Sequence, residues 1–274
     1  MRAGVADVLA EIVERRRGRL AAEGYGEGLA AAVAAEAAEE PPLTAANNRF
    51  LAALTTAPAP AVIAEIKLGS PRLGSLAGRF DPEAVARAYA AAGAAALSVV
   101  VEPDFFGGSY GLLARCRAAS GLPALAKDFV VHPAQLERAR AAGADAVLLI
   151  AALYDRAELA ALSALARGLG LVPLIETHDE ADLDLLDGAG DDWELVGINH
   201  RDLRTFEVDL GRSAALVPRL PAGAIKVAES GIASGADVAR LAAAGFDAFL
   251  IGESLLLAAD PGAKLRALRE ERPR

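Results

Sequence analysis

The chain has 274 residues, 54% of them apolar, and a formal net charge of −9 with an isoelectric point near 5.0. This acidic balance argues against a broad basic surface for nucleic acid or an anionic membrane, so a bound anion is expected to be small and held locally. The single cysteine, Cys116, excludes an internal disulfide and lies in a helical pattern that predicts a structural, half-buried thiol. Because neither a signal peptide nor a run of about 18 uncharged apolar residues is evident, we expect a cytoplasmic protein.

Residues 1–60 predict a helical extension. Two helices are expected at about 4–22 and 27–38, and a third near 45–54 follows the break "EEPPLT". So short a segment buries little surface by itself, so we expect it to pack on the rest of the chain and not to form an independent domain.

From residue 61 onward, short apolar runs predict eight strands. Their starts are 23 to 34 residues apart, which is the spacing of one strand and one crossover helix. Helix-start signals such as Asp81 followed by Pro82, and "AAG" endings before the next strand, lie between them. The expected strands are 61–67, 95–101, 122–127, 146–151, 171–176, 194–199, 224–230 and 248–252.

Continuously apolar strands indicate a parallel sheet that is buried on both faces. Eight such repeats over residues 61–274 predict an α/β fold, a (βα)8 TIM barrel that forms the catalytic domain. An open, doubly wound sheet is the alternative, and it is weakened because no strand is followed by a G-x-G-x-x-G turn.

Polar side chains stand where the expected strands end, which is the face that carries the chemistry in such barrels. Glu65 and Lys67 lie two positions apart and therefore point the same way, into the barrel interior. A group of buried structural ion pairs is the alternative, but buried charges rarely benefit folding, so a catalytic site is favoured. Burial and a second lysine would lower the pKa of a site lysine, whereas nearby glutamates would raise it. The other residues at strand ends are Lys127, Glu176, Asn199, Arg201, Glu229 and Ser230.

The last two expected strands end in "ESGIASG" and "IGES". Gly231 and Gly252 let the backbone approach closely, and the N–H groups of the following helix starts favour an anion, which predicts a phosphate site over ordinary helix caps. The histidines His132, His178 and His200 are interpreted as polar residues at or near helix starts, and no metal is expected.

These motifs resemble the indole-3-glycerol phosphate synthase family. The segments "IAEIK", "FFGGSY", "LVPLIETHDEADL", "VGINHRDLRTFEVDL", "KVAESGI" and "FLIGESLL", together with 125–150, occur in the order of that family. The resemblance implies no cofactor and a phosphorylated small-molecule substrate, 1-(2-carboxyphenylamino)-1-deoxyribulose 5-phosphate. Its conversion gives indole-3-glycerol phosphate, CO2 and water in tryptophan biosynthesis. An association with other enzymes of that pathway is a further expectation.

The resemblance also implies roles. Lys127 is the expected general acid, Glu176 acts in acid–base steps, and Lys67 pairs with the substrate carboxylate beside Glu65. The division of proton transfers among Lys67, Lys127 and Glu65 stays open. The expected catalytic residues are Glu65, Lys67, Lys127, Glu176, Asn199 and Ser230. The expected substrate-binding residues are Ser70, Phe106, Phe129, Leu148, Arg201 and Glu229, and those near the phosphate are Ser70, Gly231, Gly252 and Glu253.

The loop "KLGSPRLG" departs from the family pattern. Leu68 and Leu73 stand where the family usually has basic residues, and Arg72 carries a charge one position earlier. A Schiff-base aldolase with a shifted substrate and a non-catalytic binding barrel are the alternative functions. A phosphoribosylanthranilate isomerase is disfavoured, because Glu65 or Lys67 stands where its strand carries a cysteine base.

Overall fold

The computed structural model describes residues 7–25, 43–187, 193–202 and 207–270. Two helices of the extension fall in these ranges, α1 (Asp7–Ala22) and α3 (Arg49–Thr56). The helix expected at 27–38 lies outside the described residues. Helix α3 begins later than expected, because the side chain of Asn48 accepts hydrogen bonds from the backbone N–H groups of Phe50 and Leu51 and so fixes the helix start.

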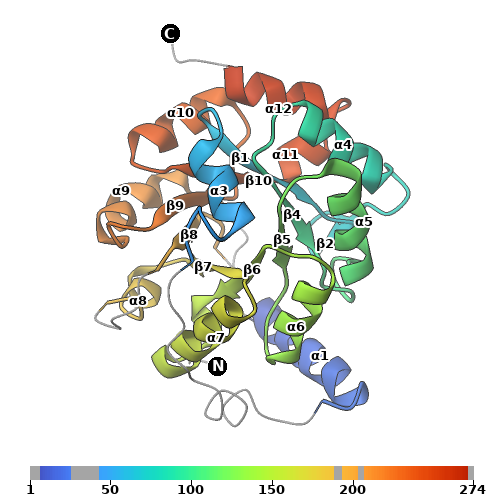
Figure 1. Cartoon of the computed structure of the whole chain (residues 1–274). Coiled ribbons are helices and arrows are strands. Elements are labelled where there is room, and N and C mark those ends of the chain that lie inside the picture. Colours follow the sequence, from blue (N-terminus) through green and yellow to red (C-terminus); the bar gives the residue numbers. More distant parts are fainter. Residues whose placement is uncertain (1–6, 26–42, 188–192, 203–206, 271–274) are drawn as a thin grey trace.

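The strands form a closed parallel barrel with the order β1-β4-β5-β6-β7-β8-β9-β10 (Figure 1). Strand β1 pairs with both β4 and β10, so the barrel prediction is confirmed and the open-sheet alternative is wrong. Every predicted strand is present within a few residues of its expected bounds. The strands are β1 (Ala61–Ile66), β4 (Ala96–Val100), β5 (Ala124–Lys127), β6 (Ala146–Ile150), β7 (Val172–Thr177), β8 (Leu195–Asn199), β9 (Ile225–Glu229) and β10 (Ala248–Ile251).

Helices surround the barrel, and their starts follow from capping side chains. Asp81 accepts a hydrogen bond from the backbone of Glu83 and precedes Pro82, as the sequence indicated. Ser234 and Asp237 form a reciprocal capping box. The helices are α4 (Pro82–Ala91), α5 (Tyr110–Ser120), α6 (Ala134–Ala141), α7 (Arg156–Gly168), α8 (Glu180–Leu183), α9 (Ser213–Leu216), α10 (Gly235–Ala243), α11 (Glu253–Leu256) and α12 (Pro261–Glu270), with 3-10 turns η1 (Ala151–Leu153), η2 (Leu210–Arg212) and η3 (Val217–Arg219).

The loop after β1 contains a small antiparallel hairpin that the apolar pattern did not predict. Its strands are β2 (Gly69–Ser70) and β3 (Gly74–Ser75). The side-chain oxygen of Ser70 accepts a hydrogen bond from the backbone N–H of Leu73 at 3.0 Å. The hairpin therefore holds the segment after Lys67 in a defined conformation.

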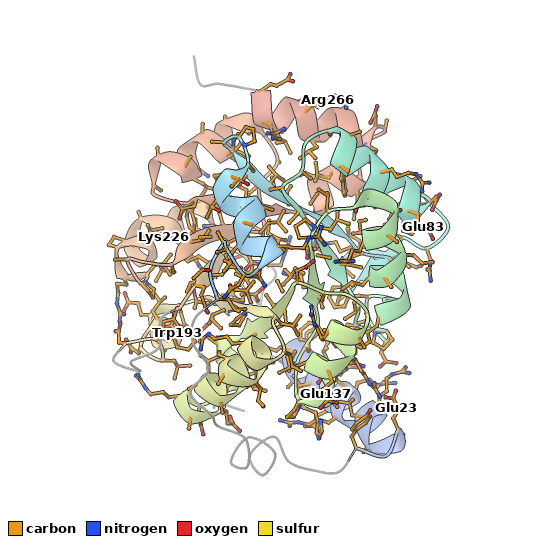
Figure 2. The ribbon with its side chains drawn as sticks, viewed as in Figure 1. Glu23, Glu83, Glu137, Trp193, Lys226 and Arg266 are labelled. Carbon is orange, nitrogen blue, oxygen red and sulfur yellow. The ribbon has the colours of Figure 1, made fainter. Side chains whose placement is uncertain are left out.

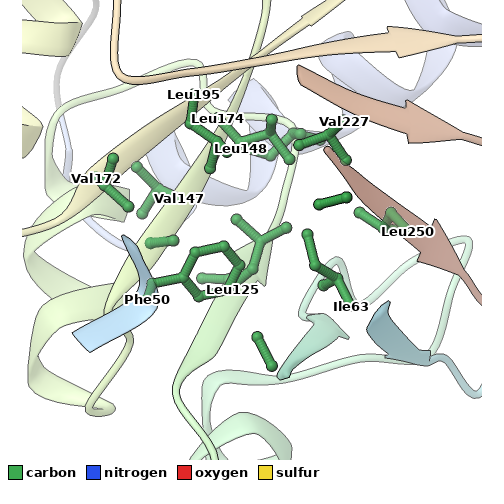
Figure 3. Packing of buried hydrophobic residues seen from close by; sticks show 14 of the residues in the cluster. Phe50, Ile63, Leu125, Val147, Leu148, Val172, Leu174, Leu195, Val227 and Leu250 are labelled. Atoms are coloured by element: carbon green, nitrogen blue, oxygen red, sulfur yellow. The ribbon is translucent and has the colours of Figure 1, made fainter. Parts of the chain in front are cut away.

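Apolar side chains fill the barrel interior, where Ile63, Leu148 and Leu250 converge from different strands (Figure 3). Charged side chains such as Glu137 and Arg266 lie on the outer helices (Figure 2). Cys116 is fully buried and not half-buried as expected, and burial raises the pKa of its thiol to about 12, so the structural interpretation of this residue is supported. Among the described residues, no helix has both the length and the apolar character needed to span a membrane.

The two described helices of the extension contact opposite ends of the barrel. Phe50 of α3 belongs to the barrel core, and Asn48 donates to the carbonyl oxygens of Asp145 and Gly170, just before β6 and β7 begin. Helix α3 therefore covers the amino-terminal ends of the strands. Arg16 of α1 instead forms a buried ion pair of 2.5 Å with Asp128, just after β5 ends. Helix α1 therefore lies at the carboxyl-terminal ends.

Candidate active site

A cavity of about 450 Å³ opens at the carboxyl-terminal ends of the strands. Every residue to which the sequence assigned a site role borders it. Helix α1 adds an apolar wall of Val8, Leu9 and Ile12 that the sequence did not predict. The expected residues at the cavity are Glu65, Lys67, Ser70, Phe106, Lys127, Phe129, Leu148, Glu176, Asn199, Arg201, Glu229, Ser230, Gly231, Gly252 and Glu253.

Lys127 stands among three buried carboxylates. Its Nζ atom lies 3.0 Å from Oε2 of Glu229, 3.4 Å from Oε2 of Glu176 and 4.0 Å from Oε2 of Glu65. A second lysine, Lys67, lies 2.7 Å from Oε1 of Glu65. All three carboxylates are at most 5% exposed. The parallel register brings these strand ends to one level and so creates the cluster from residues far apart in sequence.

Two glycines make room for this cluster. A Cβ atom at Gly252 would collide with the side chain of Glu65, and one at Gly197 would collide with the carboxylate of Glu229. Gly197 was not singled out from the sequence. Its contribution depends on which side chains meet inside the closed barrel.

The sequence left open whether the pKa of a site lysine is raised or lowered, and the charges around Lys127 give the direction. Burial lowers the pKa of Lys127, but Glu229, Glu176 and Glu65 outweigh burial and raise the pKa above its usual range. Burial raises the pKa of Glu65, yet Lys67 and Lys127 outweigh it, so that pKa lies below its usual value. Lys127 also holds the pKa of buried Glu176 below its usual value. Near neutral pH, Lys127 is therefore a cation, and Glu65 and Glu176 are anions.

Glu229 differs from the other two carboxylates. Burial and the nearby charge of Glu176 raise its pKa to about 7, although Lys127 opposes the shift. Nδ1 of the neighbouring His200 forms a hydrogen bond of 2.9 Å with the backbone carbonyl oxygen of Glu229. Burial lowers the pKa of this histidine. Glu229 is thus a group that gains or loses a proton near neutrality.

The residues expected near a phosphate form a polar region of the cavity. Ser230 adopts a left-handed backbone with φ of 67°, and the next residue, Gly231, has φ of 76°. A non-glycine residue in this conformation is strained, which is characteristic of functional turns. Arg72 forms an ion pair with Glu253, and Arg201 lies 3.6 Å from the other oxygen of the same carboxylate. The displaced charge of the "KLGSPRLG" loop therefore faces this region.

Another part of the cavity is apolar, and two phenylalanines form its wall. The rings of Phe106 and Phe129 lie 5.9 Å apart between centroids, with a 35° angle between their planes. The carboxylate of Glu102 accepts hydrogen bonds from three successive backbone N–H groups, the last of them at Phe106, and so shapes the loop that presents this ring. Together with Leu148 and helix α1, these rings provide a surface on which an aromatic ring can pack.

The histidines have contacts that their sequence positions did not reveal. Nδ1 of His132 accepts from the backbone of Ala134, as expected at a helix start. His178 directly precedes the N-cap of α8, as expected for a residue at a helix start, and it also lies 3.2 Å from Oε1 of Glu176 and 3.4 Å from Oδ2 of Asp182, contacts that the sequence did not predict. In the described parts of the chain, no three His, Cys, Asp or Glu residues form a group that could hold a metal ion.

A closed (βα)8 barrel with a buried lysine–carboxylate cluster at the carboxyl ends of its strands is the architecture of a barrel enzyme. The family model described as indole-3-glycerol phosphate synthase matches residues 9–268. The chain therefore belongs to the indole-3-glycerol phosphate synthase family.

Similar proteins agree with this membership. An indole-3-glycerol phosphate synthase of Azoarcus sp. (strain BH72) is 46% identical over 269 residues, which cover 96% of this chain and 99% of the relative. One of Polaromonas sp. (strain JS666 / ATCC BAA-500) is 43% identical over 264 residues, with 96% and 98% covered. Among solved structures, tryptophan synthase subunit alpha of Legionella pneumophila str. Paris superposes with a TM-score of 0.58 at 14% identity, covering 81% of this chain and 97% of that one. At that identity, the likeness shows the barrel fold alone.

Proposed function

We propose that this protein converts 1-(2-carboxyphenylamino)-1-deoxyribulose 5-phosphate into indole-3-glycerol phosphate, CO2 and water. The observation that carries the proposal is the combination in one cavity of a protonated, carboxylate-paired lysine with an apolar, aromatic wall. Family membership supplies the substrate class.

The substrate has three parts that match three parts of the cavity. Its carboxyphenyl ring would pack on Phe106 and Phe129, with its carboxylate paired to Lys67. Its phosphate would lie beside Gly231 and Arg72, where backbone N–H groups and arginine charge favour an anion. The ribulose carbonyl then falls between these ends, within reach of Lys127.

In the first step, the ring carbon that bears the carboxylate attacks the ribulose carbonyl carbon. A proton from Lys127 converts the carbonyl oxygen into a hydroxyl group as the new carbon–carbon bond forms. The carbon–carbon bond to the carboxylate then breaks, CO2 leaves, and the electron pair restores the aromatic ring. Lys67 holds the substrate carboxylate during the attack, and this ion pair must weaken before CO2 departs.

Dehydration completes the reaction. The new hydroxyl group leaves as water after protonation, and a proton is lost from the five-membered ring, which gives the indole. Glu176, ionised and 3.4 Å from Lys127, is placed to accept a proton and to return it. The division of these transfers between the two lysines and Glu65 stays open.

A Schiff-base aldolase is less well supported. Such an enzyme needs a neutral lysine nucleophile, which is produced by desolvation or by neighbouring cations. The carboxylates around Lys127 instead raise its pKa and hold it protonated. Borohydride reduction in the presence of a phosphosugar is expected to leave the protein unmodified.

The decisive experiment incubates the purified full chain with the carboxyphenylamino-deoxyribulose phosphate and follows indole fluorescence. Activity is expected from wild type, with a loss of about 10²- to 10⁴-fold in Lys127→Ala. No signal from wild type would favour the non-catalytic binding barrel. Residual binding of the substrate, measured by calorimetry, would identify that alternative directly.

Three finer expectations stay predictions. These are a cytoplasmic location, an association with other tryptophan-pathway enzymes, and the division into a 1–60 extension and a 61–274 catalytic domain. Fractionation of its own cells would test the location, and co-purification with a tagged chain would test the association.

A further inference from the structure

We propose that His178 is a positioning residue for Glu176: Asp182 holds the imidazole as a cation, and that cation holds Glu176 as an oriented anion. The series of contacts Asp182–His178–Glu176 has been given no role above. The inference deepens the proposed function and rests on it, because Glu176 is the carboxylate assigned to proton transfer.

The geometry places one cation at each oxygen of Glu176. Nε2 of His178 lies 3.2 Å from Oε1, while Nζ of Lys127 lies 3.4 Å from Oε2. Oε1 is therefore occupied by the histidine, and Oε2 is left to face the lysine and the cavity. This arrangement fixes which oxygen of the carboxylate can exchange a proton with substrate.

Asp182 completes the chain on the other side of the ring. Its Oδ2 atom lies 3.4 Å from Nδ1 of His178 and also accepts the backbone N–H of His178 at 2.9 Å. Both residues are buried, with His178 8% exposed and Asp182 3% exposed. Because a buried carboxylate stands on each side of the ring, the protonated imidazole is the favoured form.

The contact with Glu176 is electrostatic more than directional. Oε1 lies off the direction in which the ring N–H points, so the pair does not form a well-aligned hydrogen bond. Such a contact stabilises the anion only when the imidazole is charged. Burial lowers the pKa of His178, but its partners Asp182 and Glu176 outweigh burial and raise that pKa to about 10.

The charge balance of the buried cluster leads to the same assignment. Lys67 and Lys127 balance the charges of Glu65 and Glu176 when Glu229 carries its proton. A protonated His178 in turn balances Asp182, whose Oδ2 atom lies 3.4 Å from the ring. The cations are then Lys67, Lys127 and His178, and the anions are Glu65, Glu176 and Asp182.

The groups that act on Glu176 come from several elements. The charges are Lys127 of β5, Glu229 of β9 and Glu65 of β1, and the amide of Asn199 on β8 also contacts the carboxylate. In the described part of the chain, the ion pair at Oε1 is with His178 and the one at Oε2 is with Lys127. Removing the charge of His178 should therefore raise the pKa of Glu176 while the lysine contact on Oε2 remains.

The test uses His178→Gln, Asp182→Asn and the matched control His132→Asn, all in the full chain. Glutamine can still fill the site and donate a hydrogen bond but carries no charge. We expect kcat/KM of His178→Gln to fall about tenfold or more at pH 5, with the loss shrinking to about threefold at pH 8, because Glu176 without its histidine cation is protonated at acidic pH but is still held ionised by Lys127 near neutrality. The kcat/KM of Asp182→Asn should lie between the values of His178→Gln and wild type. His132→Asn, which keeps an acceptor for the backbone of Ala134, should stay within about twofold.

A second readout needs no substrate. The imidazole resonances of His178, identified by their loss in His178→Gln, should keep the signature of a protonated ring up to pH 8 in wild type and titrate at lower pH in Asp182→Asn. An ordinary titration near 6.5 in wild type, or a loss of kcat/KM that is equal at all pH values, would overturn the proposal. If wild type forms no indole-3-glycerol phosphate while the resonances behave as expected, the proposed function is wrong, but the contacts Asp182–His178–Glu176 still hold the imidazole as a cation. If His178→Gln does not fold, the pH dependence of kcat/KM in Asp182→Asn still decides.

Discussion

Nζ of Lys127 lies 3.0 Å from Oε2 of Glu229, whose side chain is 1% exposed. The pair joins a lysine with a raised pKa to a carboxyl group that has a pKa of about 7. The site thus contains, side by side, a permanent cation and a group that changes charge within the physiological range. The first predictions follow from this relationship.

Glu229 should make stability depend on pH. Because its folded-state pKa lies above the unfolded value, the folded chain binds its proton more tightly, and this contribution is present below about pH 4.5 and lost as pH rises through about 7. Glu229→Gln has no carboxyl group to titrate at this position, so it does not lose this stability as pH rises. The unfolding free energy of the variant minus that of wild type is therefore expected to increase by about 1–3 kcal/mol from pH 5 to pH 8. Urea denaturation at the two pH values measures this difference, and a constant difference would contradict the assignment.

Lys127→Met should destabilise the fold as well as abolish turnover. Its removal leaves buried carboxylates without their shared cation, which typically costs about 3–5 kcal/mol. Glu176 has a lowered pKa that depends on Lys127, so the cost should be present above pH 4.5 and shrink as pH falls and the carboxylates are protonated. Thermal unfolding of the variant and wild type at pH 4.5 and pH 7.5 provides the comparison. Equal destabilisation at both values would show that packing, not charge, dominates.

Gly252→Ala should displace Glu65. The added Cβ would collide with that carboxylate, so we expect a loss of about 1–3 kcal/mol in stability and a larger proportional loss in kcat. Gly18→Ala is the matched control, because nothing lies within 4 Å of a Cβ at that helical position. The control should gain about 0.5–1 kcal/mol of stability with kcat unchanged. Full activity in Gly252→Ala would mean that Glu65 can move without consequence.

Arg72 and Glu253 should affect phosphate affinity in opposite directions. Glu253 is an internal anion that competes with phosphate for Arg72 and Arg201, so Glu253→Gln is expected to lower the inhibition constant of inorganic phosphate, and Arg72→Leu to raise it, each by about three- to tenfold. Arg115→Leu, which removes an exposed ion pair with Glu83 on outer helices, is the control and should change nothing. Parallel shifts in both site variants would argue against this competition.

The strands and the convergence of the expected site residues on one cavity could be predicted, because both depend on local patterns. Apolar runs mark strands that are buried on both faces, and polar residues at their ends, such as Lys127 and Glu176, share one face in any parallel barrel. The contact of His178 with Glu176 could not be predicted in the same way. It depends on the conformation of the turn after β7, where the backbone N–H of His178 is bound by Asp182.

The hairpin β2–β3 and the wall formed by α1 were missed for related reasons. Two-residue strands such as Gly69–Ser70 carry no apolar alternation. The position of α1 is fixed by the ion pair between Arg16 and Asp128, residues 112 apart in the chain, and no periodicity encodes such a pairing. The departure at Arg72 was visible in the sequence, but its partner Glu253 was identified only through the closed barrel.

The closure of the barrel through β1 and β10 has a consequence for folding. Glu65 and Gly252, which pack against each other in the cavity, come from strands at the two ends of the barrel sequence, and the wall of α1 precedes both. A chain emerging from the ribosome thus contains most of the cavity-lining residues before it has a cavity. Ligand binding and the protection it confers against unfolding should begin only when the last strand has joined the first, so a bound substrate analogue would report on completion of the whole fold.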